Sequence, residues 1–306
     1  MKYLIGMDGG GTKTKCIITD LDINPIYETT GGPSNFLMLG NEKVAATILD
    51  LIKDCVENQK INLDDIESIV LGTTGGGRRS DAESLELSIL ESAKSKSLTL
   101  KKLRVESDAR IALEGAFSGK PGSILIAGTG SIMFGKDANG EIHRVGGFGR
   151  FLGDEGSGYR IGQRGLNAVA KDFDGRGNKT LMSELVFKQF SISSPELLIT
   201  EIYRNNFDIA SAAPIVLEAA EKNDKEAIKI IESEADEMIL HISAMKEKLN
   251  EKTFYVSLVG SLLTKENYYS YLFKEKVVKK FSDVVIKEAE NPPEIGAVLM
   301  AKNIIN

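Results

Sequence analysis

Short β-rich runs and longer helical stretches alternate along the chain. Residues 3–7, 15–19 and 24–30 are rich in β-branched and aromatic side chains, and the glycine turn between the first two runs predicts a hairpin. Residues 42–59 have a helical period instead, because apolar positions recur on one face, at Val44, Ile48, Leu51, Ile52 and Cys55. The chain therefore opens as a small sheet followed by an amphipathic helix.

The same criteria assign the rest of the chain. Strands are predicted at residues 66–71, 103–106, 123–127, 132–136, 141–145, 254–259 and 284–287. Helices are predicted at residues 81–95, 109–117 and 157–173, in a further series that ends at residue 250, and at residues 293–305. Pro293 suits the first turn of that last helix.

The order strand, strand, strand, helix, strand, helix, strand, helix occurs twice. Each copy has a glycine-containing loop directly after its first strand, at residues 8–13 and 128–131. This duplication predicts an α/β fold of two domains that mix parallel and antiparallel strands. We expect domains at residues 1–117 and 118–306, divided near the Pro121-Gly122 turn, with the last helix able to pack back on the first domain. An interdomain cleft is the expected place for a small-molecule site.

Composition narrows the class of protein. The chain has 306 residues and a formal net charge of -6, which disfavours a general nucleic-acid binder. It has no run of 18 apolar residues, and its first residues are neither a signal peptide nor an anchor, so we expect a cytoplasmic protein without a membrane span. Cys16 and Cys55 have no CxxC neighbour, and we expect both to be buried apolar side chains.

The segment DGGGTK, residues 8–13, follows an apolar strand. Its glycines let the backbone approach a ligand and present N–H groups, and the hydroxyl and the cation beside them suit phosphate oxygens. Asp8, at the strand end, is placed to hold Mg²⁺ through water. A Walker loop is excluded because the GxxxxGK[ST] pattern is absent and a strand follows. We interpret the segment as a phosphate-binding hairpin rather than a plain turn.

The segment GTGS, residues 128–131, repeats this chemistry in the second half of the chain. Two such loops in matching positions can clamp a polyphosphate from two sides. The Gly260-Ser261 pair, after the strand at residues 254–259, is of a kind that packs on a nucleotide base or ribose. The candidate residues for binding a nucleotide are Asp8, Gly10, Gly11, Thr12, Lys13, Gly128, Thr129, Gly130, Gly260 and Ser261.

Asp108 lies in the segment SDAR, just past the strand at residues 103–106. One interpretation makes it a helix N-cap. The other makes it the group that accepts a hydroxyl proton from a substrate. Phosphoryl transfer needs mainly positioning and charge neutralisation, with one group to orient the attacking hydroxyl, so a single carboxylate suffices.

Residues 146–158 hold six glycines, two acids and an arginine in thirteen positions. A plain loop does not require this density, while close backbone contact and hydroxyl-binding carboxylates suit a polyol. We interpret the segment as a sugar-binding loop that leads into a helix, with an Ω-loop of no ligand-binding role as the alternative. His143 and His241 are expected to be unclustered.

These motifs together resemble the BadF/BadG/BcrA/BcrD ATPase family, and within it the N-acetylglucosamine kinase branch. DGGGTKTKCIITD is similar to the family's first phosphate motif, LIAGTGSI to its second, and SLVGSLL to its adenosine motif. GGFGRFLGDEGSGYRIG resembles the stretch that distinguishes the branch. The resemblance runs nearly end to end. It implies two duplicated ribonuclease-H-like domains, the actin-like ATPase fold.

The resemblance also implies roles for single residues. Thr12 and Thr129 would contact the phosphates of ATP, Asp8 would support Mg²⁺, and Asp108 would be the catalytic base for the sugar 6-hydroxyl. The sugar site would consist of Asn35, Asp108, Ser131, Gly147, Phe148, Gly149, Arg150, Phe151 and Asp154. Phe148 stands where the family usually has Trp, so N-acetylglucosamine, glucosamine and N-acetylmuramic acid stay open as substrates. Relatives often dimerise, which makes a homodimer an expectation.

Other functions on the same fold stay open. An ATPase that activates a radical dehydratase would hold an iron–sulfur cluster with paired cysteines and carry a GGQD-type motif in its second half, which is missing here. A sugar-sensing regulator would add a DNA-binding helix-turn-helix, for which the strand at Tyr3 leaves no room. A kinase for glucose or a polyol is a further alternative, although the chain lacks the Cys-rich zinc segment of one glucokinase-like group.

Overall fold

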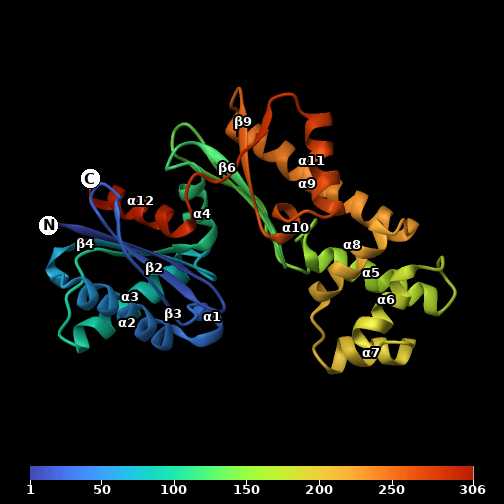
Figure 1. Ribbon diagram of the computed structural model, residues 1–306, viewed down its shortest axis with the longest axis horizontal. Coiled ribbons are helices and arrows are strands. Elements are labelled where there is room, and N and C mark those ends of the chain that lie inside the picture. The colour runs from blue at the N-terminus through green and yellow to red at the C-terminus, as the bar shows by residue number, and fades with distance from the viewer. Residues whose placement is uncertain (306) are drawn as a thin grey trace. The chain divides into compact units, whose positions relative to one another are not determined.

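The computed structural model describes residues 1–305 of the chain and divides them into two compact units (Figure 1). The first unit contains residues 1–122 together with the chain from Glu288 onward, and the second contains Ser123–Lys287. Each unit is built on its own five-stranded sheet. None of the helices within residues 1–305 is long and apolar enough to cross a membrane.

The sheet of the first unit has the strand order β3-β2-β1-β4-β5. The first three strands form an antiparallel meander, and β4 and β5 add to it in parallel. The strands are β1 (Tyr3–Gly9), β2 (Thr14–Asp20), β3 (Pro25–Gly31), β4 (Ile66–Thr73) and β5 (Leu103–Ser107). The hairpin expected from the opening residues is confirmed as the β1–β2 pair.

Helices cover both faces of this sheet (Figure 1). They are α1 (Phe36–Leu39), α2 (Asn41–Gln59), η1 (Leu63–Asp65), α3 (Arg79–Ser95), α4 (Asp108–Ala116) and α12 (Pro293–Ile305). Side chains alternate along β1, so Ile5 and Met7 pack in the core with α2 and α3, while Leu4 packs in the core with α4 and α12. The C-terminal helix α12 therefore completes the core of the first unit.

The sheet of the second unit repeats the first. Read from the β8 edge, its strand order is β8-β7-β6-β9-β10. This matches the order β3-β2-β1-β4-β5 of the first sheet, because β6, β7, β8, β9 and β10 take the places of β1, β2, β3, β4 and β5. The strands are β6 (Gly122–Ala127), β7 (Ser131–Lys136), β8 (Ile142–Gly146), β9 (Phe254–Val259) and β10 (Val284–Ile286). The duplication predicted from the order of elements is confirmed at the level of sheet topology.

A large helical layer packs on the second sheet. Its helices are α5 (Gly158–Phe173), α6 (Leu181–Phe190), α7 (Pro195–Arg204), η2 (Ile209–Ala212), α8 (Ala213–Glu221), α9 (Lys225–Leu249), α10 (Ser261–Thr264) and α11 (Tyr268–Lys280). Their buried residues form one continuous core with β6, β7 and β9. The 25-residue helix α9 packs against β7, β8, α5, α8 and α11.

Of two predictions about single side chains, the one about the cysteines is confirmed and the one about His143 is wrong. Cys16 and Cys55 are buried in the core of the first unit as free thiols with Sγ atoms 3.5 Å apart, as expected for apolar packing. The expectation that His143 is unclustered is wrong, because the β7–β8 turn brings its Nε2 to 3.0 Å from Asp137 Oδ2, with Glu141 alongside. Among the described residues, His241 belongs to no such group.

Candidate functional site

The first glycine loop is fixed on one side and open on the other. Its turn is closed by the Gly10 N–H, which donates to Lys13 O at 2.9 Å. Gly9 packs so tightly on Ser34 that a Cβ atom at this position would lie 1.8 Å from the Ser34 Oγ. Gly11, by contrast, faces open space. Thr12 and Lys13 are also exposed, so the hydroxyl and the cation are available to a ligand.

A chain of hydrogen bonds connects this loop to two other predicted site residues. The Ser34 N–H donates to Gly10 O at 3.0 Å, which fixes the segment that continues into Asn35. On the other side, the Thr74 N–H donates to Gly9 O at 3.1 Å, and the Thr74 hydroxyl donates to Asp108 Oδ2 at 2.8 Å. The first glycine loop, Asn35 and Asp108 are therefore brought together within the first unit.

Asp108 is not the cap of its helix. The N-cap of α4 is Ser107, whose hydroxyl accepts the Arg110 N–H at 3.1 Å, so the N-cap interpretation of Asp108 is wrong. Asp108 is the first residue within the helix, where the exposed backbone N–H groups favour a negative charge. Its Oδ1 accepts the Ala109 N–H at 2.7 Å and Oδ2 accepts from Thr74, so the carboxylate is held in one orientation while half-buried.

The Asn35 side chain has a buried acceptor atom without a hydrogen-bond partner among the described residues. Asn35 precedes α1 in the N-cap position, yet its side chain makes no capping hydrogen bond. Its Oδ1 is buried and has no hydrogen-bond partner within residues 1–305. A buried amide oxygen without a partner is costly, and a ligand hydroxyl or amide N–H would supply the missing hydrogen bond.

Asp8 lies at the end of β1 among other acids. The pKa of its carboxyl is raised to about 6, mainly by burial and then by the negative charges of Glu294 and Asp108, against a smaller opposing effect of Lys15 and Lys13. Glu294, at the start of α12, is only 7% exposed; its Oε1 accepts from Lys15 Nζ at 3.3 Å, and its Oε2 has no partner among the described residues. Oxygen donors with excess negative charge fit a hydrated Mg²⁺.

The second glycine loop has a similar construction in the second unit. Its turn is closed by the Gly128 N–H, which donates to Gly130 O at 2.9 Å, and Thr129 between them is exposed. β9 runs parallel to β6, so the Gly260 turn lies at the same sheet edge. A Cβ at Gly260 (φ +93°) would meet Ala127 O at 2.2 Å, which requires glycine there.

The glycine-rich loop, residues 146–158, is joined to the second glycine loop by hydrogen bonds. The Gly158 N–H donates to Gly128 O at 2.8 Å, and the Tyr159 N–H donates to Thr129 O at 3.1 Å. The Ser131 hydroxyl donates to Glu155 O at 2.6 Å, so this buried side chain supports the loop from below. The predicted phosphate and sugar segments of this unit therefore form one connected structure.

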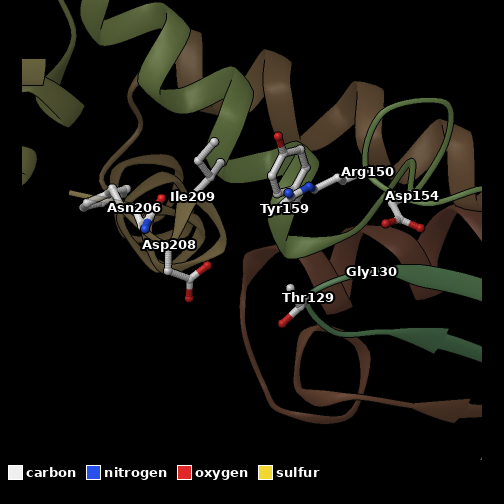
Figure 2. A pocket seen from close by; sticks show the side chains of 9 residues that line it. Thr129, Gly130, Arg150, Asp154, Tyr159, Asn206, Asp208 and Ile209 are labelled. Carbon is white, nitrogen blue, oxygen red and sulfur yellow. The ribbon is translucent and has the colours of Figure 1, made fainter. Parts of the chain in front are cut away.

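A pocket of about 410 Å³ lies at this junction. Figure 2 shows Thr129, Gly130, Arg150, Asp154 and Tyr159 on one side and Asn206, Asp208 and Ile209 on the other; Phe207 completes the lining. The Arg150 guanidinium lies 5.9 Å from the centre of the Tyr159 ring, and burial raises the pKa of Asp154. The pocket joins residues predicted for phosphate binding with residues predicted for sugar binding.

The tip of the glycine-rich loop lies outside this pocket lining. Phe148 is 70% exposed and Phe151 is 83% exposed. Arg144 lies 5.5 Å from the centre of the Phe148 ring and Arg150 lies 5.1 Å from that of Phe151. Gly149 faces open space, while a Cβ at Gly147 would meet Ile132 at 2.3 Å. These side chains are accessible to a ligand that extends beyond the pocket.

Several residues of these sites were missed at the level of sequence. Thr74 belongs to the segment TTGGG at residues 73–77, which follows β4 and resembles the other glycine loops, so composition could have indicated it. Tyr159 lies within the stretch GGFGRFLGDEGSGYRIG, so that motif could have indicated it. Asn206, Asp208 and Glu294 lie in no motif. They reach the sites only through the tertiary fold.

Two sheets of identical topology, each with a glycine loop after its first strand, define an actin-like ATPase fold of the sugar-kinase type. The sequence profile of the BadF/BadG/BcrA/BcrD ATPase family matches residues 5–301, and the chain belongs to this family. Use of ATP follows from that membership.

Individual proteins resemble the chain over almost its whole length. The N-acetylmuramic acid/N-acetylglucosamine kinase of Clostridium acetobutylicum is 34% identical, covering 99% of both chains. The N-acetyl-D-glucosamine kinase of Dictyostelium discoideum is 29% identical, covering 99% of this chain and 98% of its own. The crystal structure of a candidate N-acetylglucosamine kinase from Chromobacterium violaceum superposes with a TM-score of 0.75 at 24% identity, covering 98% of this chain and 99% of the other, which supports the fold.

Proposed function

We propose that the protein is an ATP-dependent amino-sugar kinase that phosphorylates the 6-hydroxyl of N-acetylglucosamine, N-acetylmuramic acid or a close relative such as glucosamine. Relatives that carry the first two activities in their names match the chain end to end. The observation that carries the proposal is the hydrogen-bond chain from Gly9 through Thr74 to Asp108, because it holds a candidate base beside a candidate phosphate loop.

Asp108 is the proposed catalytic base. As the sugar hydroxyl oxygen attacks the γ-phosphorus, its proton passes to the Asp108 carboxylate, and the bond from the γ-phosphorus to the bridging oxygen of ADP breaks. The Thr74 hydroxyl and the Ala109 N–H orient the carboxylate before the reaction. Orientation of this kind is the main contribution that a protein makes to phosphoryl transfer.

The remaining predicted residues bind and orient. The proposed phosphate contacts are the hydroxyls of Thr12 and Thr129, with Lys13 as a cation and the glycine-loop N–H groups as donors. Asp8 would hold Mg²⁺ through water, and the ion would neutralise phosphate charge. The residues proposed to bind the sugar are Asn35, whose buried Oδ1 has no partner among the described residues, and Asp154 and Arg150, which line the pocket. Gly260 and Ser261 are proposed to contact the nucleoside.

The dehydratase-activator alternative is disfavoured by the two cysteines. A cluster shared at a dimer interface needs thiolates at the surface, whereas Cys16 and Cys55 are no more than 1% exposed and lie in the core between β2 and α2. The sensor alternative can be separated from a kinase by one measurement, because a kinase releases ADP when its sugar is present and a non-catalytic sensor does not.

The first experiment is an ADP-release assay across N-acetylglucosamine, N-acetylmuramic acid, glucosamine, N-acetylmannosamine and glucose, with wild type and Asp108→Asn. The variant keeps the size of the side chain but loses the base, so we expect turnover to fall about 10²- to 10⁴-fold. ATP binding, measured by calorimetry, should change little.

Asp81→Asn is the matched control. Asp81 also lies in the first turn of a helix of the first unit, so this variant removes the same charge from a similar backbone position. It should retain the wild-type turnover. Turnover of Asp108→Asn equal to that of the control would exclude Asp108 as the base, and absence of sugar-dependent ADP release in wild type would refute the kinase proposal.

A further inference from the structure

One helix lies beneath both ends of the glycine-rich loop. Gly146 and Gly156 both have positive φ values, +70° and +77°. A Cβ at Gly146 would meet His241 Nε2 at 2.3 Å, and a Cβ at Gly156 would meet Met238 Sδ at 2.3 Å. Both partners lie on α9, three residues apart and therefore on one face. The two ends of the loop are thus seated on a common support.

Gly156 is held by two further contacts from buried side chains. Its N–H donates to Glu234 Oε2 at 2.7 Å, and its carbonyl accepts from the Tyr269 hydroxyl at 2.9 Å. Glu234 is one turn before Met238 on α9, and Tyr269 is at the start of α11. Glu234 is 2% exposed and Tyr269 is fully buried. Both backbone polar groups of one loop residue are therefore fixed from the core.

The charge of Glu234 is compensated by the element that follows the loop. Arg164 Nη1, on α5, donates to Glu234 Oε1 at 2.8 Å. A buried carboxylate needs such a partner, because an isolated charge in a core is strongly unfavourable. Glu234 therefore ties together three parts of the unit: its own helix, α5 and the glycine-rich loop.

The tip of the loop is exposed to solvent and contains a strained residue. Phe151 and Leu152 are each 83% exposed, and Asp154 has a positive φ of +58°, which is strained for a residue with a side chain. Gly156 is only two residues from Asp154. A fixed Gly156 restricts the conformations that Asp154 can adopt.

We propose that Glu234 and Tyr269 are positioning residues for the amino-sugar site, which lock Gly156 and thereby hold the glycine-rich loop in its substrate-binding conformation. This inference rests on the proposed function, since the loop is the segment proposed to bind the sugar. When only a fraction of the molecules has a competent loop, the apparent affinity for the sugar falls by that fraction. Saturating sugar restores the competent loop, so the maximal rate is preserved.

The experiment compares Tyr269→Phe and Glu234→Gln with wild type. Tyr269→Phe removes only the hydroxyl that donates to Gly156. Glu234→Gln keeps the volume of the side chain but leaves one acceptor oxygen for two donors, the Gly156 N–H and the Arg164 guanidinium. For each variant we expect the KM for the sugar to rise roughly 5- to 20-fold, the range for loss of a buried hydrogen bond, with kcat and the KM for ATP within about twofold.

Two substitutions control for a general loss of stability. Asp172→Asn alters a buried carboxylate of the same unit that accepts from Ser183 and Thr180, and Tyr27→Phe removes a tyrosine hydroxyl that donates to Asp54 in the first unit. Both should lower the Tm without changing the KM for the sugar. A KM that follows the Tm across all four variants would overturn the proposal.

A second measurement needs no substrate. Arg150 is an exposed trypsin site within the loop. We expect cleavage after Arg150 to be faster in Tyr269→Phe and Glu234→Gln than in wild type, but unchanged in the two controls. Equal cleavage rates in all proteins would overturn the anchoring role, whether or not the enzyme acts on amino sugars. Faster cleavage in a protein that phosphorylates none of the sugars would support the anchor and refute the proposed function instead.

Discussion

Asp8 shows how a residue of a candidate ligand site can lower the stability of the protein that contains it. Its carboxyl is partly buried near Glu294 and Asp108, and no described side chain donates a hydrogen bond to it in compensation. The result is a pKa of about 6 in place of the ordinary value of 3.8. At neutral pH the Asp8 carboxyl is therefore ionised in surroundings that favour its neutral form, and a proton or a cation would relieve this cost.

Replacement of Asp8 by Asn should stabilise the metal-free protein at neutral pH. Between pH 3.8 and 6 the folded state binds more protons at Asp8 than the unfolded chain does, so the free energy of unfolding falls as the pH rises through this window. The loss is complete above pH 6. Asp8→Asn removes the ionisable group and with it this loss of stability. The free energy of unfolding at pH 7.5 should therefore rise by about 1–2 kcal/mol after allowance for solvent screening.

The measurement is urea unfolding in EDTA from pH 4 to pH 8. Asp20→Asn gives a contrast, because hydrogen bonds from Asn24 lower the pKa of Asp20, so that carboxylate stabilises the fold above its titration range. This second variant should be less stable than wild type at pH 7.5. An Asp8→Asn protein that is less stable than wild type at every pH would contradict the argument.

At the level of helices and strands, the local pattern of apolar and turn residues was sufficient to predict most of the elements of the fold. The apolar face of α2 contains the five residues that the helical period selected, and all of them are buried. The three glycine-containing segments form the loops expected after strands: residues 10–13 follow β1, residues 128–130 follow β6, and residues 147–157 connect β8 to α5. Period and turn chemistry act over a few residues, so the chain itself displays them.

Contacts between distant segments were not predictable in the same way. Glu234 bonds to Gly156 across 78 residues of sequence, and Lys15 bonds to Glu294 across 279. The exchange of roles between Ser107 and Asp108 has another cause, because both are good N-caps and only the backbone decides where the helix begins. The candidate sites were thus predictable as loops, while the side chains that support them were not.

The packing of α12 on α4 depends on one glycine. A Cβ at Gly296 would lie 1.9 Å from Ile111 O and 2.5 Å from Gly115 N, both of which are backbone atoms of α4. Backbone atoms cannot move aside without displacing the helix. We expect Gly296→Ala to lower the free energy of unfolding by about 2–4 kcal/mol, as for an overpacked core.

Gly77→Ala is the control for this experiment, because a Cβ at Gly77 meets nothing within 4 Å. Its effect should be about 0.5 kcal/mol or less in urea unfolding. If the two alanine variants were equally stable, the close approach of α12 and α4 could not be a source of stability.

The whole chain is organised as an insertion. It leaves the first unit after Gly122 and returns at Glu288, so the second unit lies between two parts of the first in sequence. The points of departure and return are adjacent: the Glu290 N–H donates to Ala116 O and the Asn291 N–H donates to Gly115 O, both at 3.1 Å. A short connection could therefore replace the whole of the second unit.

This arrangement predicts which parts of the chain fold alone. Residues 123–287 contain their complete sheet apart from Gly122 and the whole of their apolar core, so the isolated fragment should give a cooperative thermal transition by circular dichroism. Residues 1–122 alone lack α12, which leaves Leu4, Ile17, Val70 and Ile111 uncovered, and should aggregate or unfold.

A fusion of residues 1–120 through a short Gly/Ser linker to residues 288–306 tests the cause. If the missing helix alone explains the failure of residues 1–122, the fusion should be monomeric and fold cooperatively. Addition of Gly296→Ala to the fusion should weaken it again, because the same α12–α4 contact would be lost. Cooperative folding of residues 1–122 without α12 would mean that the C-terminal helix covers the first unit without being needed for its core.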